Sequence, residues 1–343
     1  MPFNASQNTK IAIAIEKWFA KEARDLPWRK KDTPWGRLLS ELMAQQTQIQ
    51  RVAEKWVMMI DRFPSPSAMA ESDEQEVLLL WEGLGYYRRA RYLKEASEQI
   101  CNDHGGEVPQ NVKDLLTLKG VGRYTAGAVA SIAYNNREPI VDGNVHRVVC
   151  RLLNESDYGV NDSWTWESAK NLVDNCKTPS NLNEGLMELG ATVCTPKNPN
   201  CEVCPVRSMC SAFKHGTQFK VPKPKSSPKK QKEFHYAVLF QKNNKIALEH
   251  RDAKGLWAGM WQVPTIESTK KLTKKELGFC FNVQHCLEKL GTFNHILTHK
   301  TIEFHVFECS GSNKKLNWFE TSNLHEFPFA NAQKKVLSFR ALS

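Results

Sequence analysis

Four cysteines within seventeen residues constrain the fold of this chain more than any other feature. Their spacing is C-x6-C-x2-C-x5-C, and the residues are Cys194, Cys201, Cys204 and Cys210. Four thiolates at such spacing can bind either an iron–sulfur cluster or a structural zinc ion. Because zinc sites usually contain two C-x2-C pairs and this loop contains one, the spacing favours the cluster and leaves zinc open. In either case we expect a compact metal-bound loop, structural rather than catalytic.

Composition limits the compartment and the partners of the chain. Its 343 residues suffice for two domains of ~100–200 residues each. Lys and Arg number 47 against 37 Asp and Glu, and this surplus favours nucleic acid or an anionic membrane as partner. No apolar run approaches the ~20 residues of a membrane span, and the first residues lack the apolar stretch of a signal peptide. The six other cysteines, Cys309 among them, are scattered, and we expect ordinary core or surface thiols. We therefore expect a cytoplasmic protein, associated with the nucleoid if bacterial.

The hydrophobic pattern changes once along the chain. Residues 1–213 show apolar residues at helical spacing, interrupted by short Gly or Pro breaks. Residues 214–233 contain seven Lys and three Pro with almost nothing apolar, which is typical of a linker. Residues 234–343 contain short β-rich runs and a possible helix near 281–290, which predicts an α+β domain.

Two glycines join neighbouring helical stretches at 118–127, LKGVGRYTAG. A turn through Gly120 and Gly122 exposes backbone N–H groups at a helix N-terminus. Such donors can hold a DNA phosphate without reading the base sequence. A simple packing turn between two helices also fits this segment, because glycine pairs alone are weak signals.

Carboxylates occur in two further polar segments. Asp142, in IVDGNVHR, precedes an apolar helix and can be its N-cap, a role that is compatible with catalysis. In SELMAQQTQ, Glu41 and Gln45 are four residues apart on one helix face, beside Gln46. An ordinary polar helix end would have the same pattern.

The segment GLGYYRRAR at 83–91 combines glycines, two tyrosines and three arginines. This mixture suits gripping phosphate and sliding an aromatic ring into a base stack. An aromatic core contact flanked by solvated basic residues is the alternative interpretation.

Taken in order, these segments closely resemble adenine DNA glycosylases of the MutY type, in the helix-hairpin-helix superfamily that also contains endonuclease III. The resemblance covers nearly the whole chain and includes LPWR at 26–29 and a second domain after the cysteines. It implies a mainly α N-terminal glycosylase region, with a six-helix barrel-like module and a [4Fe–4S] cluster module. It further implies an α+β Nudix-like C-terminal domain and base excision repair of adenine opposite 8-oxoguanine or guanine, by a monomer acting on double-stranded DNA.

The resemblance assigns the two carboxylates to catalysis. Adenine leaves readily only after N7 is protonated, so Glu41 is expected to donate that proton and ionised Asp142 to stabilise the positive charge on the sugar. For Glu41 to hold a proton near neutral pH, burial in an apolar pocket must raise its pKa. Tyr124 and Asn144 match family positions beside the reacting sugar and Asp142.

Further residues match family positions that contact DNA. Arg29 and Glu184 are expected to contact the flipped adenine, and Gln46 and Tyr86 to occupy the space around the oxidised guanine. Gln45 is also expected to contact DNA.

The C-terminal domain resembles a Nudix fold through GLWAGMWQVP at 255–264, but it lacks the acidic helix of pyrophosphohydrolases. Family members read oxidised guanine with a Phe-Ser-His loop, which Leu297, Thr298 and His299 match except for Leu in place of Phe. We expect Thr298 and His299 to contact the oxidised base, and a plain β-turn is the alternative.

Three other functions compete with this prediction. An endonuclease III type lyase needs a lysine where this chain has Tyr124, and His146 stands where some relatives carry a lysine that traps the abasic product, so we expect no imine chemistry. A non-catalytic DNA-binding protein would not need Glu41, Asp142 and Tyr124 together. A Nudix hydrolase of free nucleotides would need the missing acidic helix.

Overall fold

The computed structural model describes residues 3–156, 159–223, 230–252, 254–283, 287–309 and 316–342. Packing contacts divide the chain into two compact units. The first, which we call the helical unit, comprises Met1–Glu71 and Tyr92–Lys225, and the second, the sheet unit, comprises Ser72–Arg91 and Ser226–Ser343. A stretch of about twenty residues from the helical half of the sequence therefore packs with the C-terminal strands.

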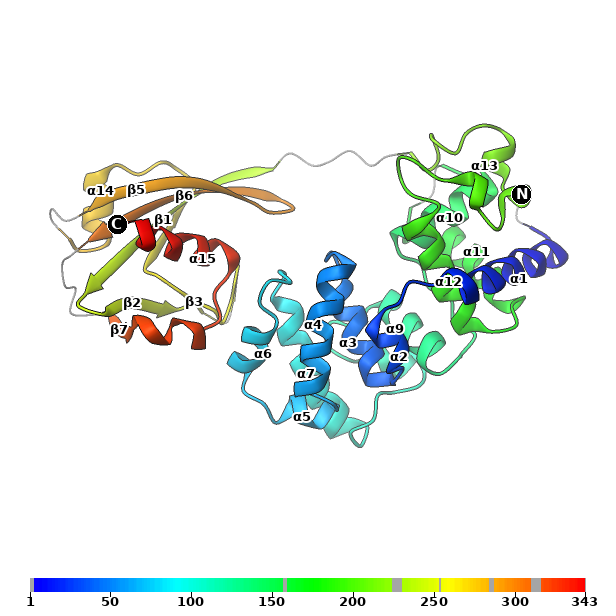
Figure 1. Cartoon of the computed structure of the whole chain (residues 1–343), viewed down its shortest axis with the longest axis horizontal. Helices are drawn as coiled ribbons and strands as arrows, with labels where there is room; N and C mark the ends of the chain where they lie inside the picture. Colours follow the sequence, from blue (N-terminus) through cyan, green and yellow to red (C-terminus); the bar gives the residue numbers. More distant parts are fainter. Residues whose placement is uncertain are drawn as a thin grey trace. The chain divides into compact units, whose positions relative to one another are not determined.

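The helical unit is built from short helices joined by tight turns (Figure 1). Its helices are α1 (Ala5–Glu22), α2 (Pro27–Lys30), α3 (Pro34–Ala44), α4 (Ile49–Arg62), α5 (Pro66–Ala70), most of α7 (Arg88–Asp103), α8 (Val112–Leu115), α9 (Arg123–Ala128), the π-helix η1 (Val129–Ala133), α10 (Gly143–Leu153), α11 (Ser163–Asp174), α12 (Pro179–Thr192), the 3-10 turns η2 (Cys201–Val203) and η3 (Arg207–Met209), and α13 (Ser211–Lys214). The helix starts follow local chemistry. Asn4 and Gln7 form a capping box at α1, and Thr33 caps α3 ahead of a proline at its first position.

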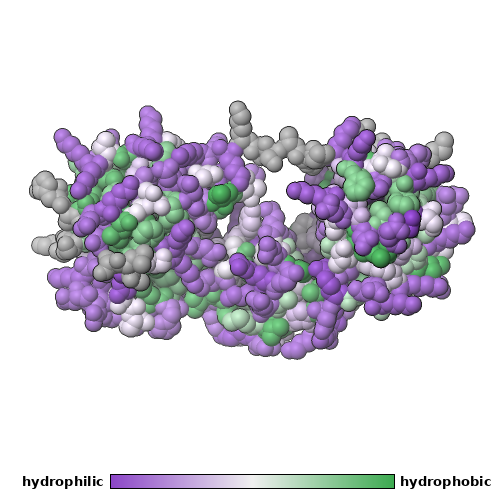
Figure 2. All heavy atoms as spheres, turned by 45° about the horizontal axis from the view of Figure 1, so that its top comes forward, coloured by the Kyte–Doolittle hydropathy of each residue, from purple (hydrophilic) through white to green (hydrophobic). Residues whose placement is uncertain are grey.

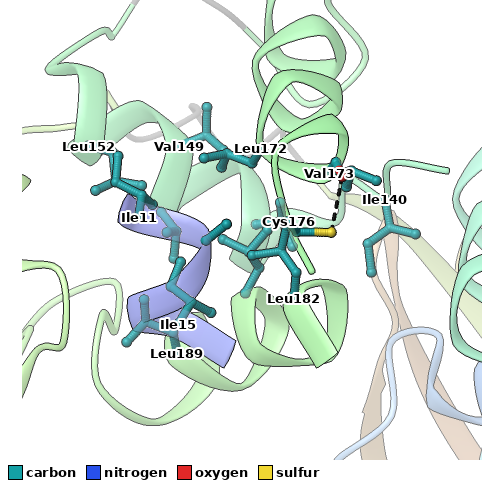
Figure 3. Close-up of a cluster of buried hydrophobic side chains, with 14 of the residues drawn as sticks. Ile11, Ile15, Ile140, Val149, Leu152, Leu172, Val173, Cys176, Leu182 and Leu189 are labelled. Carbon is teal, nitrogen blue, oxygen red and sulfur yellow. Dashed lines mark hydrogen bonds between the residues drawn. The ribbon is translucent and has the colours of Figure 1, made fainter. Parts of the chain in front are cut away.

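One apolar cluster holds α1, α10, α11 and α12 together (Figure 3). In Figure 3, Ile11 and Ile15 of α1 point toward Leu182 and Leu189 of α12. Burying a side chain of this size contributes about 1.5–3 kcal/mol to the free energy of folding. This packing holds together the helices that carry the candidate site.

The sheet unit contains a mixed seven-stranded sheet, counted over the described residues (Figure 1). Its elements are α6 (Glu74–Leu80), β1 (Gln231–Lys242), β2 (Lys245–His250), β3 (Trp261–Gln262), β4 (Thr265–Ser268), α14 (Lys274–Cys280), β5 (Glu288–Ile296), β6 (Lys300–Cys309), β7 (Asn317–Glu320), η4 (Thr321–Glu326), α15 (Asn331–Ser338) and η5 (Phe339–Leu342). The strand order is β3-β2-β1-β6-β5, β4 pairs with β1, and β7 pairs with β2. Only β1 and β6 are parallel among these pairs.

Two expectations for the C-terminal half are wrong. The helix expected near 281–290 is α14, which ends at Cys280, and β5 begins at Glu288. Thr273 and Glu276 form a capping box that starts this helix, and Leu277 packs into the sheet core. Cys309, expected to be an ordinary thiol, is disulfide-bonded.

The face of the molecule shown in Figure 2 is mainly polar. Hydrophilic side chains dominate this face, and the apolar ones form separate small patches. None of the described helices is long and apolar enough to cross a membrane.

Candidate active site and cysteine loop

Glu41 lies on α3 inside the helical unit. Glu41 is 8% exposed, and the Tyr124 hydroxyl donates a hydrogen bond to its Oε2 at 2.8 Å. Burial raises the pKa of Glu41, and the neighbouring Glu184 and Asp142 raise it further, while Arg37 and the Tyr124 hydrogen bond oppose the rise. The net direction of the pKa shift is upward, which is the direction that the proposed acid role requires.

Asp142 is the N-cap of α10, and backbone N–H groups surround its carboxylate. Its Oδ1 accepts from the backbone N–H groups of Asn144 and Val145 at 2.9 and 2.7 Å. Its Oδ2 accepts from the Asn144 side-chain amide at 2.8 Å. These donors fix the orientation of the carboxylate. Capping, the alternative role for Asp142, is therefore present in the structure.

Tyr124 stands close to both carboxylates. Burial raises its pKa well above the ordinary value, and the negative charges of Glu41 and Asp142 raise it further. Its hydroxyl also contacts the Met187 sulfur at 3.1 Å. A phenol with such a pKa stays neutral, and it offers a hydroxyl rather than an amine.

Asn144 is fixed by Arg147, which sequence reasoning did not single out. The Arg147 guanidinium donates to Asn144 Oδ1 at 2.9 Å, to the Gly190 carbonyl at 2.7 Å and to the Cys194 carbonyl at 2.7 Å. One side chain thus ties the start of α10 to α12 and to the first residue of the cysteine loop.

Glu184 and Arg29 form an ion pair beside α3. Arg29 Nε donates to Glu184 Oε1 at 3.0 Å, and its Nη2 donates to Glu188 Oε2 at 3.1 Å. Glu188 Oε1 also accepts a hydrogen bond from Arg24 Nε at 2.6 Å. Burial acts to raise the pKa of Glu188, but its pairing with Arg24 and Arg29 outweighs burial and lowers that pKa. The structure therefore brings Arg29 and Glu184 together, and their contact with adenine stays a prediction. It adds Glu188 and Arg37, whose only sequence signal is the four-residue spacing from Glu184 and from Glu41, and Arg24, which has no such signal.

The glycine turn lines a hollow next to Tyr124. Gly120 has φ +77°, and a Cβ there would lie 2.8 Å from the Tyr92 Cβ, so this position requires glycine. Gly122 is the N-cap of α9. The hollow is lined by Gln45, Gly120, Gly122, Arg123, Tyr124, Thr125, Val141, Asn161 and Trp166. Sequence reasoning missed Arg123, whose guanidinium lies 3.8 Å from the centre of the Trp166 ring.

Gln46 and Tyr86 share an uncommon backbone conformation. Their φ angles are +56° and +46°, and both side chains are exposed. Non-glycine residues adopt this region at a cost and are enriched at functional sites. Each is therefore held in an unfavourable backbone conformation and faces solvent within its own unit.

Within the sheet unit, the segment GLGYYRRAR at 83–91, here called the tyrosine segment, contacts the predicted recognition loop at 297–299. Leu297 N donates to the Lys300 carbonyl at 2.8 Å, so the loop is the tight turn between β5 and β6, as the alternative interpretation expected. At its tip Thr298 and His299 are exposed, and the Thr298 hydroxyl hydrogen-bonds the Tyr86 hydroxyl. The turn and the tyrosine segment thus present neighbouring polar groups.

The arginines of this segment differ in environment. Arg89 is buried, and its guanidinium donates to the carbonyls of Leu84 and Gly85 at 3.2 and 3.0 Å. Burial lowers the pKa of Arg89 to about 10. Arg89 therefore braces the loop behind Tyr86, whereas Arg88 is exposed.

The four cysteines of the loop, Cys194, Cys201, Cys204 and Cys210, line a single hollow together with Arg151 and Arg207. Burial and the neighbouring sulfurs of the other three cysteines together raise the pKa of the Cys204 thiol to about 12, so all four lie close together. Arg151 Nη1 lies 3.3 Å from the Cys194 sulfur and can offset the charge of bound thiolates.

The chemistry of the loop is compatible with both metal interpretations. Among the described residues, no group of three His, Cys, Asp or Glu side chains is arranged to hold a single metal ion. Four cysteine thiols are a donor set that suits either an iron–sulfur cluster or a zinc ion.

Known families match three successive parts of the chain. Residues 39–182 match the HhH-GPD superfamily of base excision DNA repair proteins, 194–210 the iron–sulfur binding domain of endonuclease III, and 235–339 the NUDIX domain. The expected fold class is thereby confirmed, and the cysteine loop is the site of a [4Fe–4S] cluster.

Curated relatives extend the similarity over most of the chain. The adenine DNA glycosylase of Arabidopsis thaliana is 32% identical over 92% of this chain, which spans 60% of that protein's length. That of Rattus norvegicus is 31% identical over 93% of this chain and 75% of the rat protein. A solved thermostable thymine-DNA glycosylase is 30% identical, with a TM-score of 0.57 over 61% of this chain and 98% of its own.

Proposed function

The chain belongs to the adenine DNA glycosylase family, and on that premise we propose that it hydrolyses the N-glycosidic bond of adenine paired with 8-oxoguanine or guanine in duplex DNA. The observation that carries this proposal is the buried Glu41 with its raised pKa, close to Asp142, whose side chain caps α10. Acid-assisted cleavage of a glycosidic bond requires two carboxyl groups with different roles, one as proton donor and one as stabiliser of the positive charge.

In the proposed reaction Glu41 donates its proton to N7 of the flipped adenine. The C1′–N9 bond then breaks, its electron pair leaves with the base, and positive charge develops on the sugar. Asp142 stabilises that charge, and water adds to C1′, giving an abasic site and free adenine. The proton that the water loses restores Glu41. Tyr124 orients Glu41 through its 2.8 Å hydrogen bond, and Asn144 orients Asp142.

DNA binding in this proposal uses both polar and backbone groups of the helical unit. Arg29 and Glu184 contact the flipped adenine, supported by their ion pair beside α3. Gly120 and Gly122 offer N–H groups to a phosphate, and Gln45 lines the same hollow. Flipping exposes the base to this site and leaves a gap in the duplex.

We assign the oxidised guanine to four exposed side chains. Gln46 and Tyr86 fill the gap, and Thr298 and His299 contact the oxidised base from the tip of the β5–β6 turn. The contact between the Tyr86 and Thr298 hydroxyls supports a common role within the sheet unit. Gln46 is placed here by the resemblance and by its positive φ alone.

The proposed division of labour follows the linear order of the sequence except at residues 72–91. Residues 1–213 catalyse, 214–233 link, and 234–343 recognise oxidised guanine with the help of 72–91. The [4Fe–4S] cluster, when bound by the four cysteines, supplies a structural tie rather than an acid, base or nucleophile. We further propose that the protein acts as a monomer and is cytoplasmic.

The test is incubation with duplex DNA carrying one adenine opposite 8-oxoguanine, followed by parallel hot-alkali and mild workups. We expect strand cleavage at the adenine only after alkali, because Tyr124 supplies no amine for imine chemistry. Cleavage without alkali would indicate a lyase. Tight binding with no cleavage in either lane would indicate a non-catalytic DNA-binding protein.

A further inference from the structure

Arg37 is a buried charge at the edge of the proposed adenine site. It lies on α3 one turn before Glu41, and its side chain is 1% exposed. Its Nη1 donates to Glu184 Oε1 at 3.1 Å and its Nη2 to Asp32 Oδ1 at 3.2 Å. Its Nε is buried without a hydrogen-bond partner. Burying an arginine with an unmet donor costs free energy, which suggests a role beyond stability.

The hydrogen bonds of Arg37 leave Glu184 with two unequal oxygens. Oε1 accepts from Arg37 and also from Arg29 Nε at 3.0 Å. Within the described part of the chain, Oε2 accepts no side-chain hydrogen bond of this kind. Two guanidinium groups thus fix one oxygen of the carboxylate and leave the other as an acceptor.

We propose that Arg37 is a positioning residue that holds Glu184 so that its Oε2 accepts a hydrogen bond from the exocyclic amine of the flipped adenine. This inference rests on the proposed function and deepens it. A fixed carboxylate favours a 6-aminopurine, because the amine is a donor. A base with a carbonyl at C6 would present an acceptor to an acceptor and be rejected. Asp32 contributes by anchoring the far side of the guanidinium.

Arg37 also acts on the acid itself. The charged and titratable groups that face Glu41 are Arg37 from α3, Tyr124 from α9, Glu184 from α12 and Asp142 at the start of α10. Arg37 is the largest influence that opposes burial and lowers the pKa of Glu41. Removing Arg37 therefore raises that pKa. Since the protonated acid reacts, the decline of activity with rising pH moves to higher pH.

The test measures excision by the full-length, cluster-loaded protein from two duplexes, with adenine or unsubstituted purine opposite 8-oxoguanine. Purine lacks the amine, so only adenine uses the proposed hydrogen bond. For Arg37→Met we expect kcat/KM to fall about 10- to 100-fold with adenine and less than about threefold with purine. Arg37→Lys keeps the charge without the planar fork and should lie between wild type and Arg37→Met.

Two further variants keep the result interpretable. Arg137→Met removes an arginine whose guanidinium binds the carbonyls of Val173 and Cys176, remote in role from the reaction, and should leave the adenine-to-purine ratio unchanged. If Arg37→Met does not fold, Asp32→Asn carries the test, because Asp32 is 48% exposed and its loss leaves the core filled. We expect a smaller loss of the same ratio.

Equal losses with adenine and purine, or an unchanged ratio in every Arg37 and Asp32 variant, would overturn the inference. So would an Arg37→Met pH profile that falls at the same pH as wild type. Failure of the proposed function is a separate outcome, because the wild-type protein would then not release adenine at all.

Discussion

The buried carboxylates of the helical unit and the exposed turn of the sheet unit solve opposite physical problems. Glu41 is removed from water, so that its pKa rises and its proton becomes available to a base. Thr298 and Tyr86 remain exposed and make one hydrogen bond to each other. Chemistry on a glycosidic bond benefits from desolvation, whereas recognition of a damaged base needs groups that DNA can reach. The comparison predicts that the two sites fail in different ways when mutated.

The largest expected effect is at Glu41. Glu41→Gln keeps the size of the side chain and a partner for Tyr124 but removes the proton donor. Single-turnover adenine release should fall by about 10³-fold, within the range of general acid catalysis, while affinity for the mispair persists. Parallel gel-shift and excision assays check this. Joint loss of binding and excision would mean that Glu41 is structural.

Asp142→Asn separates charge from capping at the second carboxylate. Asn is as good an N-cap as Asp, so the melting temperature should stay near that of wild type. Loss of the negative charge beside the sugar should still slow excision about 10²- to 10³-fold. Thermal unfolding measured beside single-turnover rates checks both halves. A large drop in stability with normal kinetics would assign Asp142 to capping alone.

The smallest expected effects are at the exposed turn. Thr298→Val removes the hydroxyl that contacts Tyr86, and Tyr86→Phe removes the other half of the pair. Each should reduce the preference for 8-oxoguanine over guanine opposite adenine by about three- to tenfold, as for one hydrogen bond. The double variant should lose little more, because the two hydroxyls act together. The excision rate with adenine opposite guanine should hardly change. A strong fall in that rate would mean that the turn contributes to the chemical step.

Much of this molecule could be predicted from motifs whose chemistry is local in sequence. The cysteine spacing identified the metal loop, and the capping position of Asp142 was visible in the residues that follow it. The raised pKa of Glu41 was also predicted, because the proposed chemistry demanded it. These features depend on short segments, or on a single requirement that leaves few alternatives.

The missed features depend on tertiary contacts that short patterns do not encode. Arg37 and Arg147 are ordinary helix residues in sequence, and they acquire roles only because carboxylates and carbonyls from distant segments meet them. Nor does the sequence of its segment show that Arg89 is buried behind Tyr86. The packing of 72–91 with the C-terminal strands likewise has no signal in either segment alone.

The helix error at 281–290 was of another kind. Thr273 and Glu276 have the spacing of a capping box, which predicts a helix that starts there. A search for helix starts rather than for apolar spacing would have found α14. Apolar runs in this region are shared between a short helix and the following strand, so their spacing alone could not divide them.

The pH dependence of single-turnover adenine excision tests the central claim most directly, because it reports the protonation state in which Glu41 reacts. A carboxyl whose pKa is raised by burial remains protonated above the ordinary value of 4.5. We predict that the rate with adenine opposite 8-oxoguanine declines with rising pH only above that value. A rate that increases through the same range would make Glu41 a base, and a decline at or below pH 4.5 would contradict a raised pKa.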